Sequence, residues 1–509
     1  MMTETKIDVS TFEKKIVIRE IESQDIDEIV RIAQIGFDNP DIAFEKKHYE
    51  SHIRIFPEGQ VCVLYNGQII GSSSSLIVNY EDYGDDHSID DISGGGYITN
   101  HNPNGNHLYG IDVVVHPDFR HLKIGRRLYK ERRKLCKKLN LKSIIFGGRI
   151  PNYHKYADVL TAEEYVEQVR DQQIYDPVLI FQLMNGFEIR GVKANYLLED
   201  EASLKYATIL EWKNIDHVPA DRQYYQHAMP VRISMIQYGL RNMQYFEEFA
   251  SQCEYFISLA SKKRSDFAVL PEALTLQLLS FLGEKVPSKQ IRSLTSYTEA
   301  YVKLFSDLAI RYSINIIAGS HFIEETDSIY NVSFLFHRNG KIDKQYKLHI
   351  TADERKWWGI KPGSTMDVFD TDCGKIAILI GYDILFPELA RKVVENGADI
   401  LFTPYTVEDQ QGYARIRCCA QARAIENQVY TVTTGMTGHL SRVYRMNAQY
   451  TQSSIFSPSD LGFGHNGVVT ESDFNVEMTI YGELDLELIR RNREVGTVTP
   501  LKDRRTTIY

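Results

Sequence analysis

Three segments in the second half of the chain carry residue types that suit the hydrolysis of a carbon–nitrogen bond. DFAVLPEALT contains Glu272, QYKLHITADE contains Lys347 and Glu354, and ILIGYDILFPELAR surrounds Gly381. Covalent hydrolysis of an amide or nitrile requires a nucleophile, a carboxylate that moves its proton and a cation that stabilises the developing negative charge. Glu272 and Lys347 suit the last two roles. The joint occurrence of the three segments, each at or just beyond a predicted strand end, indicates this chemistry.

A second candidate site lies in the first half of the chain. The segment from Arg120 to Lys142 contains eleven Lys and Arg residues and a single acidic residue, Glu131. Apolar residues at helical spacing predict a helix from about Ile124 to Leu139, which follows the strand-like run YGIDVVVHP and the turn DFRHLKIG. The free amides of a helix start, together with arginine side chains, suit a phosphate group. We therefore predict a phosphate of a small cofactor here, and a solvated helix surface is the alternative.

The elements that position these residues are expected to form two domains, because 509 residues exceed what one core usually serves. Hydrophobic residues make up 43% and charged residues 25%, which excludes a mostly disordered or collagen-like chain. The formal charge of -10 argues against nucleic acid or anionic lipid as a partner of the whole molecule. We predict domains over residues 1–215 and 231–509 with a polar linker over 216–230.

The location follows from what the sequence lacks. A membrane span needs about 18 consecutive apolar residues, and no stretch of the chain approaches that length. The first residues show no apolar region of the kind found in a signal peptide. The six cysteines are sparse, with no C-x-x-C pair, which is typical of reduced thiols. A cytoplasmic protein is therefore expected.

In the first region, strand-like runs at 61–64, 76–78 and 111–115 surround the basic helix. A long acidic, glycine-rich loop is predicted from Asn79 to His107. Its His87, His101 and His107 match no ligand spacing, so no metal site is predicted.

The second region alternates between helices and short apolar strands. Helices are predicted over 243–260, 386–395 and 415–426, and strands over 267–272, 315–320 and 376–381, with a hairpin that turns at Asn339-Gly340. This alternation predicts an α/β layered domain.

The segment YGIDVVVHPDFRHLKIGRRLYKERRKL resembles the acetyl-CoA-binding segment of the GNAT acetyltransferases, whose pattern is Arg/Gln-x-x-Gly-x-Gly/Ala. Arg120 and Gly125 match its ends, whereas Lys123 stands where the first glycine belongs. FQLMNGFEI resembles the family's closing segment, but the tyrosine that often acts as general acid near Phe181 and Gln182 is absent.

The GNAT resemblance implies an N-terminal α/β domain that takes acetyl-CoA as its cofactor. The residues that it implies for binding are Val113, Val115, Arg120, Lys123, Ile124, Gly125, Arg126 and Arg127. Two interpretations stay open: the domain transfers acetyl groups, or it binds acyl-CoA weakly and serves as a scaffold.

The second region resembles the nitrilase (carbon–nitrogen hydrolase) superfamily, with three motifs in the family's chain order. The resemblance implies an α-β-β-α sandwich, a homo-oligomer and a hydrolase that needs no cofactor. It implies that Glu272 is the general base, that Lys347 stabilises the tetrahedral intermediate and that Glu354 positions the substrate. GGRIPNY, RCCAQARAIENQ and DRRTTIY are similar to a subfamily in which a GNAT-like domain precedes the nitrilase domain.

One position departs from the nitrilase pattern. The family's nucleophilic cysteine lies in Ile-Cys-Tyr-Asp-x-x-Phe-Pro-Glu, and this chain has Gly381 in its place. Cys373 lies eight residues earlier, or about 26 Å along a straight strand, and Cys418 and Cys419 lie on a predicted helix. We expect none of them to replace the thiol, so the fold should survive while covalent chemistry fails. Two explanations stay open: a natural pseudoenzyme, or deliberate removal of the nucleophile.

The leading hypothesis is a carbon–nitrogen hydrolase of a small amide or nitrile, fused to a GNAT-like domain and nearly inactive as written. The alternatives are a non-catalytic ligand-binding or scaffold protein and an acetyl-CoA-dependent N-acetyltransferase.

Overall fold

The computed structural model describes residues 13–37, 39–217, 230–440, 443–444 and 446–508. The chain forms two compact units, Lys15–Tyr225 and Gln226–Tyr509, and the second also includes Met1–Lys14. Most of the predicted linker lies outside the described residues. Glu13 and Lys14 contact the second unit, since the Glu13 carboxylate accepts from the Ile342 amide and the Lys14 amide donates to the Gly340 carbonyl.

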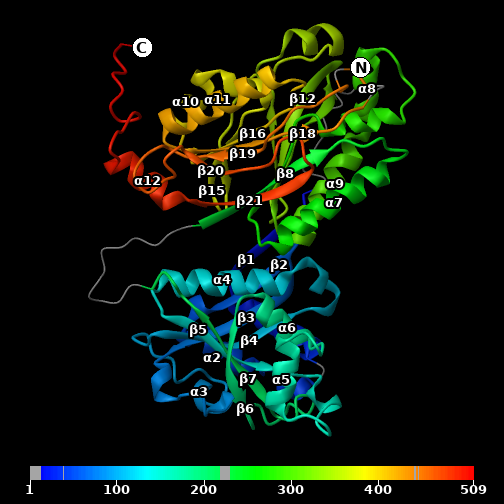
Figure 1. Ribbon diagram of the computed structural model, residues 1–509. Coiled ribbons are helices and arrows are strands. Elements are labelled where there is room, and N and C mark those ends of the chain that lie inside the picture. The colour runs from blue at the N-terminus through cyan, green and yellow to red at the C-terminus, as the bar shows by residue number, and fades with distance from the viewer. Residues whose placement is uncertain (1–12, 38, 218–229, 441–442, 445, 509) are drawn as a thin grey trace. The chain divides into compact units, whose positions relative to one another are not determined.

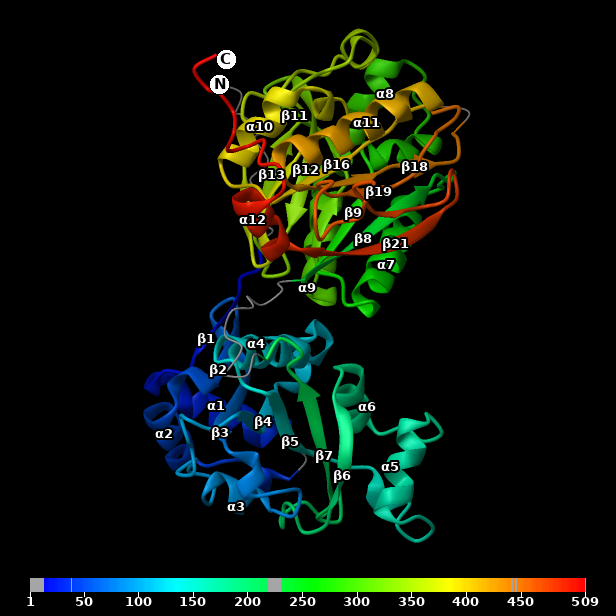
Figure 2. The same cartoon turned by 60° about the vertical axis from the view of Figure 1, so that its left-hand side comes forward.

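The N-terminal unit is built on one seven-stranded sheet of order β1-β2-β3-β4-β5-β7-β6 (Figure 2). Its strands are β1 Ile16–Glu20, β2 Gln60–Tyr65, β3 Gln68–Val78, β4 His107–Val115, β5 Ser143–Arg149, β6 Glu188–Lys193 and β7 Ala207–Lys213. All neighbours are antiparallel except β4 and β5. The parallel pair needs a crossover connection, and the predicted basic helix supplies it.

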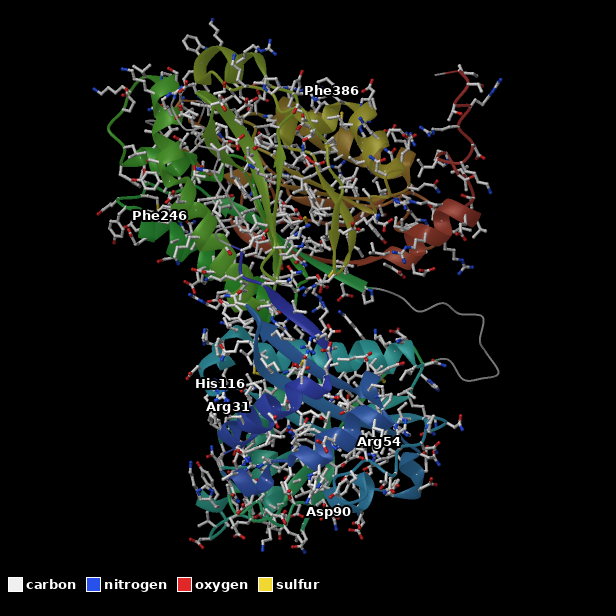
Figure 3. The ribbon with its side chains drawn as sticks, turned by 180° about the vertical axis from the view of Figure 1, so that it is seen from behind. Arg31, Arg54, Asp90, His116, Phe246 and Phe386 are labelled. Atoms are coloured by element: carbon white, nitrogen blue, oxygen red, sulfur yellow. The ribbon has the colours of Figure 1, made fainter. Side chains whose placement is uncertain are left out.

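The helices of this unit are α1 Ile26–Gly36, α2 Lys46–Ile55, α3 Ile89–Ser93, α4 Ile124–Lys138, α5 Ala162–Arg170 and α6 Pro177–Met184. The basic helix is α4, which confirms the expected helix to within one residue. The predicted loop from Asn79 to His107 contains α3, which the sequence analysis missed. Ser88 caps α3, while Asp90 on its first turn lies on the outside of the unit (Figure 3).

The C-terminal unit contains two stacked sheets. The first has the order β11-β12-β10-β9-β8-β18, with β13 beside β12 and β21 beside β8, and the second has the order β14-β15-β16-β17-β19-β20. The strands of the first are β8 Pro230–Gly239, β9 Phe267–Leu270, β10 Asn315–Ala318, β11 His321–Glu325, β12 Ser328–Phe336, β13 Ile342–Tyr346, β18 Met436–Thr437 and β21 Met478–Asp485. Those of the second are β14 Phe369–Thr371, β15 Gly374–Ile378, β16 Ile400–Pro404, β17 Tyr430–Thr434, β19 Ser454–Phe456 and β20 Val468–Glu471.

The inner faces of the two sheets bury a shared apolar layer in which Phe267 of β9 packs against Phe402 of β16. Helices α7 Phe246–Lys262 and α9 Thr298–Tyr312 cover the first sheet, and α10 Pro387–Glu395 and α11 Gln410–Asn427 cover the second (Figure 1). The remaining helices are α8 Pro287–Leu294 and α12 Leu486–Val495. The predicted α-β-β-α sandwich is confirmed, because both sheets bury apolar residues on both faces.

Local predictions in this unit hold with small corrections. The hairpin between β12 and β13 turns at Asn339-Gly340, where Gly340 takes the left-handed backbone that this turn requires. The strand expected to reach Gly381 ends at Ile378, and the helix expected from Arg415 begins five residues earlier at Gln410. The Asp409 side chain caps that helix, and the sequence analysis missed this signal.

Candidate active site

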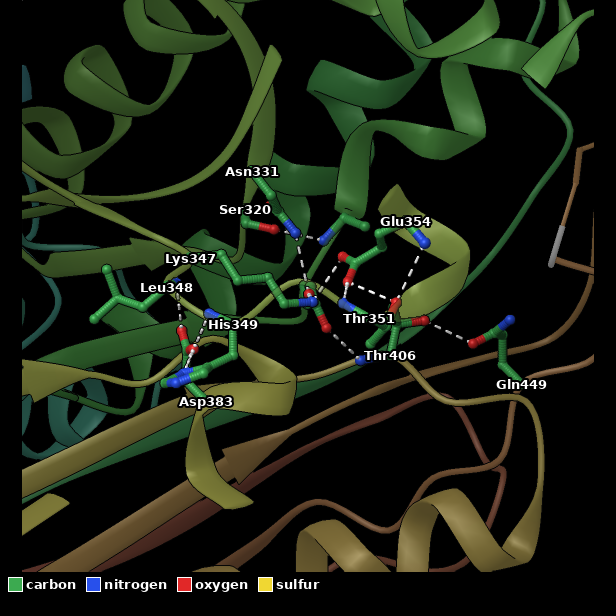
Figure 4. A network of polar contacts seen from close by, with 12 residues as sticks. Ser320, Asn331, Lys347, Leu348, His349, Thr351, Glu354, Asp383, Thr406 and Gln449 are labelled. Atoms are coloured by element: carbon green, nitrogen blue, oxygen red, sulfur yellow. Dashed lines mark hydrogen bonds and ion pairs between the residues drawn. The ribbon is translucent and has the colours of Figure 1, made fainter. Parts of the chain in front are cut away.

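Lys347 lies at the centre of the polar cluster in the C-terminal unit (Figure 4). It follows directly after β13, Glu272 lies two residues after β9, and Glu354 begins a short π-helical turn, Glu354–Trp358. The Lys347 ammonium donates to Glu272 Oε1 at 2.7 Å and to Glu354 Oε1 at 2.7 Å. The structure therefore brings together the three charged residues that the sequence predicted.

Each carboxylate is also held by neutral donors. Glu272 Oε1 accepts from the Asn331 amide group at 3.1 Å, and its Oε2 accepts from the backbone N–H of Thr406 at 3.1 Å. Glu354 Oε2 accepts from the backbone N–H and the hydroxyl of Thr351, at 2.9 and 2.8 Å. All three charged side chains are buried. Asn331, Thr351 and Thr406 were not predicted, because nothing in their local sequence shows that they face the cluster.

Two buried carboxylates share one ammonium, so their protonation preferences diverge. Burial raises the pKa of Glu272, against the attraction of Lys347. Burial also opposes the ionised form of Glu354, but the Lys347 charge and the Thr351 donors outweigh it and lower the pKa of Glu354. Burial disfavours the Lys347 ammonium too, yet the attraction of both carboxylates raises its pKa. The pKa of Glu272 is thus shifted toward the protonated form and that of Glu354 toward the ionised form.

Gly381 lies against this cluster. It begins a short 3-10 turn, Gly381–Leu385, with φ of 45°, a left-handed backbone that glycine adopts without strain. A methyl group built on Gly381 would lie 2.3 Å from Glu272 Oε2. Position 381, which the resemblance assigns to the nucleophile, therefore faces the Glu272 carboxylate, and that carboxylate occupies the space that a side chain there would need.

A polar brace joins this turn to the segment that carries Lys347. Both oxygens of the buried Asp383 accept backbone hydrogen bonds, from Leu348 at 3.1 Å and from His349 at 2.7 Å. From the other side, the Arg423 guanidinium of α11 donates to the carbonyls of Ile384 and Leu385. The brace fixes the turn relative to Lys347, and it was not predicted because its partners lie 34 to 39 residues apart.

The cysteines weighed as replacements lie elsewhere. Cys373 precedes β15, whereas Gly381 follows that strand, and the Cys373 sulfur lies 2.7 Å from a nitrogen of Arg338. Cys418 and Cys419 lie on α11, as predicted, but Cys418 is exposed rather than packed in the core.

The N-terminal unit contains an opening in its sheet. Strands β4 and β5 pair only from His107 to Tyr109, against residues 143 to 145, although β4 continues to Val115 and β5 to Arg149. Both strands are described in full, and no further pair joins them. The backbone of β4 that carries Val113 and Val115 is consequently free to pair with a ligand on the β5 side.

The predicted phosphate turn follows β4. Lys123 has φ of 55° and directly precedes α4, which begins at Ile124. The Arg120 guanidinium donates to the Gly36 carbonyl at 2.9 Å, and Arg127 is buried. The structure thus places the residues predicted for cofactor binding, from Val113 to Arg127, along one continuous path from the open strand to the start of the helix.

Phe181, near which the resemblance leads one to expect a tyrosine, packs at this turn. A methyl group built on Gly125 would lie 2.8 Å from Cζ of Phe181, so glycine allows the ring to rest against the first turn of α4. The Phe181 ring also stacks on Tyr129. An apolar ring therefore lies against the first turn of α4.

Comparison with known proteins identifies both units. The family model described as carbon-nitrogen hydrolase matches residues 232–494, and that of the acetyltransferase (GNAT) family matches residues 26–156. The chain belongs to the carbon–nitrogen hydrolase family, and a GNAT acetyltransferase domain precedes its hydrolase domain.

Relatives support the same division. Over 505 residues the chain is 56% identical to the probable hydrolase YhcX of Bacillus subtilis, covering 99% of this chain and 98% of that one. It is 39% identical to the uncharacterized N-acetyltransferase YkwB of the same organism, over 39% of this chain and 89% of the relative. The omega-amidase NIT3 of Saccharomyces cerevisiae is 30% identical over 50% of this chain and 86% of its own. The crystal structure of S. cerevisiae Nit3 aligns with a TM-score of 0.46 and 25% identity, over 54% of this chain and 97% of that one.

Two properties of the described residues concern membranes and metal ions. None of the helices there is both long and apolar enough to cross a membrane. No group of three or more His, Cys, Asp or Glu side chains in that part of the chain is arranged to hold a metal ion.

Proposed function

We propose that the hydrolase domain binds a small carboxamide or nitrile beside Lys347 and Glu272, and that it turns this ligand over at most slowly because Gly381 supplies no nucleophile. The observation that carries the proposal is the complete Glu272–Lys347–Glu354 cluster facing a residue without a side chain. The ammonium suits the developing oxyanion and the carboxylate suits proton transfer. Neither group can form the covalent intermediate that a thiol would form.

The test restores the thiol with Gly381→Cys. Ammonia release from a panel of small amides and nitriles is measured for the parent chain, for Gly381→Cys and for Gly381→Cys combined with Glu272→Gln. We expect release from Gly381→Cys only, because a positioned base alone contributes about 10²- to 10⁴-fold in rate. Activity in the parent chain would contradict the assignment of Gly381 to the nucleophile position.

The restored side chain carries a cost that the structure defines. Its Cβ needs space now taken by Glu272, and its backbone is left-handed, so we expect a loss of about 1–3 kcal/mol in the free energy of unfolding. Gly381→Ala is the matched control, since it carries the same backbone and Cβ cost without the thiol. A folded but silent Gly381→Cys would favour a diverged ligand-binding protein.

We also infer that the GNAT domain binds acetyl-CoA, and the open edge of β4 favours this second candidate function. In this proposal the phosphates of acetyl-CoA bind at the turn before α4. Its extended, amide-containing arm then runs along β4 toward the start of that strand and ends near Tyr109, where β4 and β5 separate. Calorimetry with acetyl-CoA tests this, with Arg126→Ala combined with Arg127→Ala as the weakened variant. Absence of heat and of a thermal shift at millimolar acetyl-CoA would leave only the scaffold interpretation.

The domain limits at residues 215 and 231 and the homo-oligomer remain proposals. Light scattering tests the latter, and a mass near 58.6 kDa at micromolar concentration would contradict it.

A further inference from the structure

A buried chain of hydrogen bonds runs beside the opening between β4 and β5. The imidazole of His87 bonds the Gly84 carbonyl through Nδ1 at 2.7 Å and the Tyr109 hydroxyl through Nε2 at 2.8 Å. The Tyr109 hydroxyl in turn lies 2.8 Å from the hydroxyl of Tyr196. All three side chains are buried, with exposures of 3% for His87, 0% for Tyr109 and 4% for Tyr196.

The direction of this chain follows from the chemistry of its end. A carbonyl oxygen only accepts, so His87 Nδ1 carries the hydrogen and, in the neutral ring, Nε2 is an acceptor. The single hydroxyl hydrogen of Tyr109 is therefore donated to His87, and Tyr196 donates to Tyr109. A proton taken up at Tyr196 can pass inward through two hydroxyl groups to an unprotonated nitrogen.

The sheet places this chain where the two strands part. Tyr109 is the last residue of β4 that pairs with β5. A methyl group built on Gly147 of β5 would lie 2.1 Å from Cζ of Tyr196, so the glycine lets the Tyr196 ring rest on the strand. Gly110 and Gly148, the next residues, face Arg132 of α4 and Gln182 of α6, so both tyrosines lie on the opposite face of the sheet.

We propose that Tyr196, Tyr109 and His87 form a proton relay that deprotonates the amine acceptor of acetyl transfer, with Tyr196 as the catalytic residue that contacts the amine. This inference rests on the proposed binding of acetyl-CoA along β4. The amine nitrogen attacks the thioester carbon, the carbon–nitrogen bond forms and the carbon–sulfur bond breaks. The thiolate of coenzyme A takes a proton from water.

The proton released by the amine travels along the relay. It passes to the Tyr196 oxygen while Tyr196 gives its own proton to Tyr109 and Tyr109 gives its proton to His87 Nε2. After the product leaves, the imidazolium returns its Nε2 proton through Tyr109 and Tyr196 to water that replaces the amine, which restores the starting tautomer. The relay thus supplies the base, whereas the proton for the leaving thiolate comes from water.

The surroundings keep the base neutral. Burial lowers the pKa of His87, against the Gly84 bond and the charges of Asp85 and Asp91, while Lys193 acts in the same direction as burial. The other titratable groups that face its ring are Tyr80, Tyr83, Tyr109 and Tyr196. Because the neutral ring is the active form, turnover should be constant near neutral pH and fall as acid protonates His87.

The test uses the full chain, acetyl-CoA and a panel of primary amines, with thiol release followed from pH 5 to 9. Tyr196→Phe and His87→Gln are each expected to slow turnover about 10²- to 10⁴-fold while the Kd for acetyl-CoA stays unchanged. His87→Gln should also remove the acid limb of the pH profile. Tyr153→Phe is the matched control, because this tyrosine is also buried and its hydroxyl bonds the Leu160 carbonyl outside the relay, and it should retain the parent rate and profile.

Each other outcome overturns the relay in a distinguishable way. If the Tyr196→Phe and His87→Gln proteins keep the parent rate and pH profile, the hydrogen bonds of His87, Tyr109 and Tyr196 only hold the segment that carries His87 in place. Binding of acetyl-CoA without transfer to any amine removes the relay and leaves the cofactor site standing. Absence of acetyl-CoA binding removes the proposed cofactor function and the relay with it.

Discussion

The two domains differ in what the structure completes. The hydrolase domain holds Glu272, Lys347 and Glu354 in hydrogen-bonding distance of one another and has no side chain at Gly381, the proposed nucleophile position. The GNAT domain has an opening along β4, and His87, Tyr109 and Tyr196 form a hydrogen-bonded chain beside it. Under the proposed assignments, the first domain retains a charged network without a nucleophile, and the second retains a backbone opening beside a neutral network.

The charged network is the most sensitive point of the hydrolase domain. We expect Lys347→Met to lower the free energy of unfolding by about 3–5 kcal/mol, because it leaves two buried carboxylates without their shared cation. Denaturant unfolding measures this loss. Lys344→Met, three residues earlier in β13, removes a more exposed pair with Glu325 and should cost at most about 1 kcal/mol. Equal losses for the two variants would show that the buried cluster is not special.

The GNAT domain should respond to packing rather than to charge. Gly147→Ala pushes a methyl group into the Tyr196 ring and should cost about 1–3 kcal/mol, seen as a lower Tm of that domain. Gly191→Ala in β6 is the control, since no atom lies within 4 Å of the added carbon. If Gly147→Ala matched Gly191→Ala, the Tyr196 ring would not rest on β5.

The smallest effect concerns the pH dependence of stability. The pKa of Glu272 is raised in the folded protein, so the folded state holds a proton that the unfolded state releases, and stability falls as pH rises through that folded pKa. Glu272→Gln cannot ionise and escapes this loss. Relative to the parent, its free energy of unfolding should therefore increase as the pH rises above the ordinary range of a glutamate. A difference that stays constant with pH would show that Glu272 is ionised throughout.

The sequence was sufficient for the parts of the sites that lie in short motifs. Glu272, Lys347 and Glu354 follow strand ends, and the start of α4 shows in the apolar spacing from Ile124 onward. The early end of the pairing between β4 and β5 has no local signal, since it depends on which backbone groups meet across the sheet.

The histidine interpreted first as a weak metal candidate shows the same limit. In the sequence His87 is one of three histidines in an acidic loop. In the fold its two ring nitrogens are used by Gly84 and by Tyr109, which is 22 residues away. Tertiary contacts of this range decide a residue's role and are not encoded in its neighbours.

The brace around Gly381 has a consequence for motion. A glycine in a turn normally loosens the backbone, but Asp383 bonds this turn to the Lys347 segment and Arg423 bonds it to α11. The amides of Leu348 and His349 should therefore exchange with deuterium as slowly as those of the neighbouring strands, because opening them breaks contacts on both sides of the turn. The turn therefore gains from its contacts a rigidity that its glycine alone would not provide.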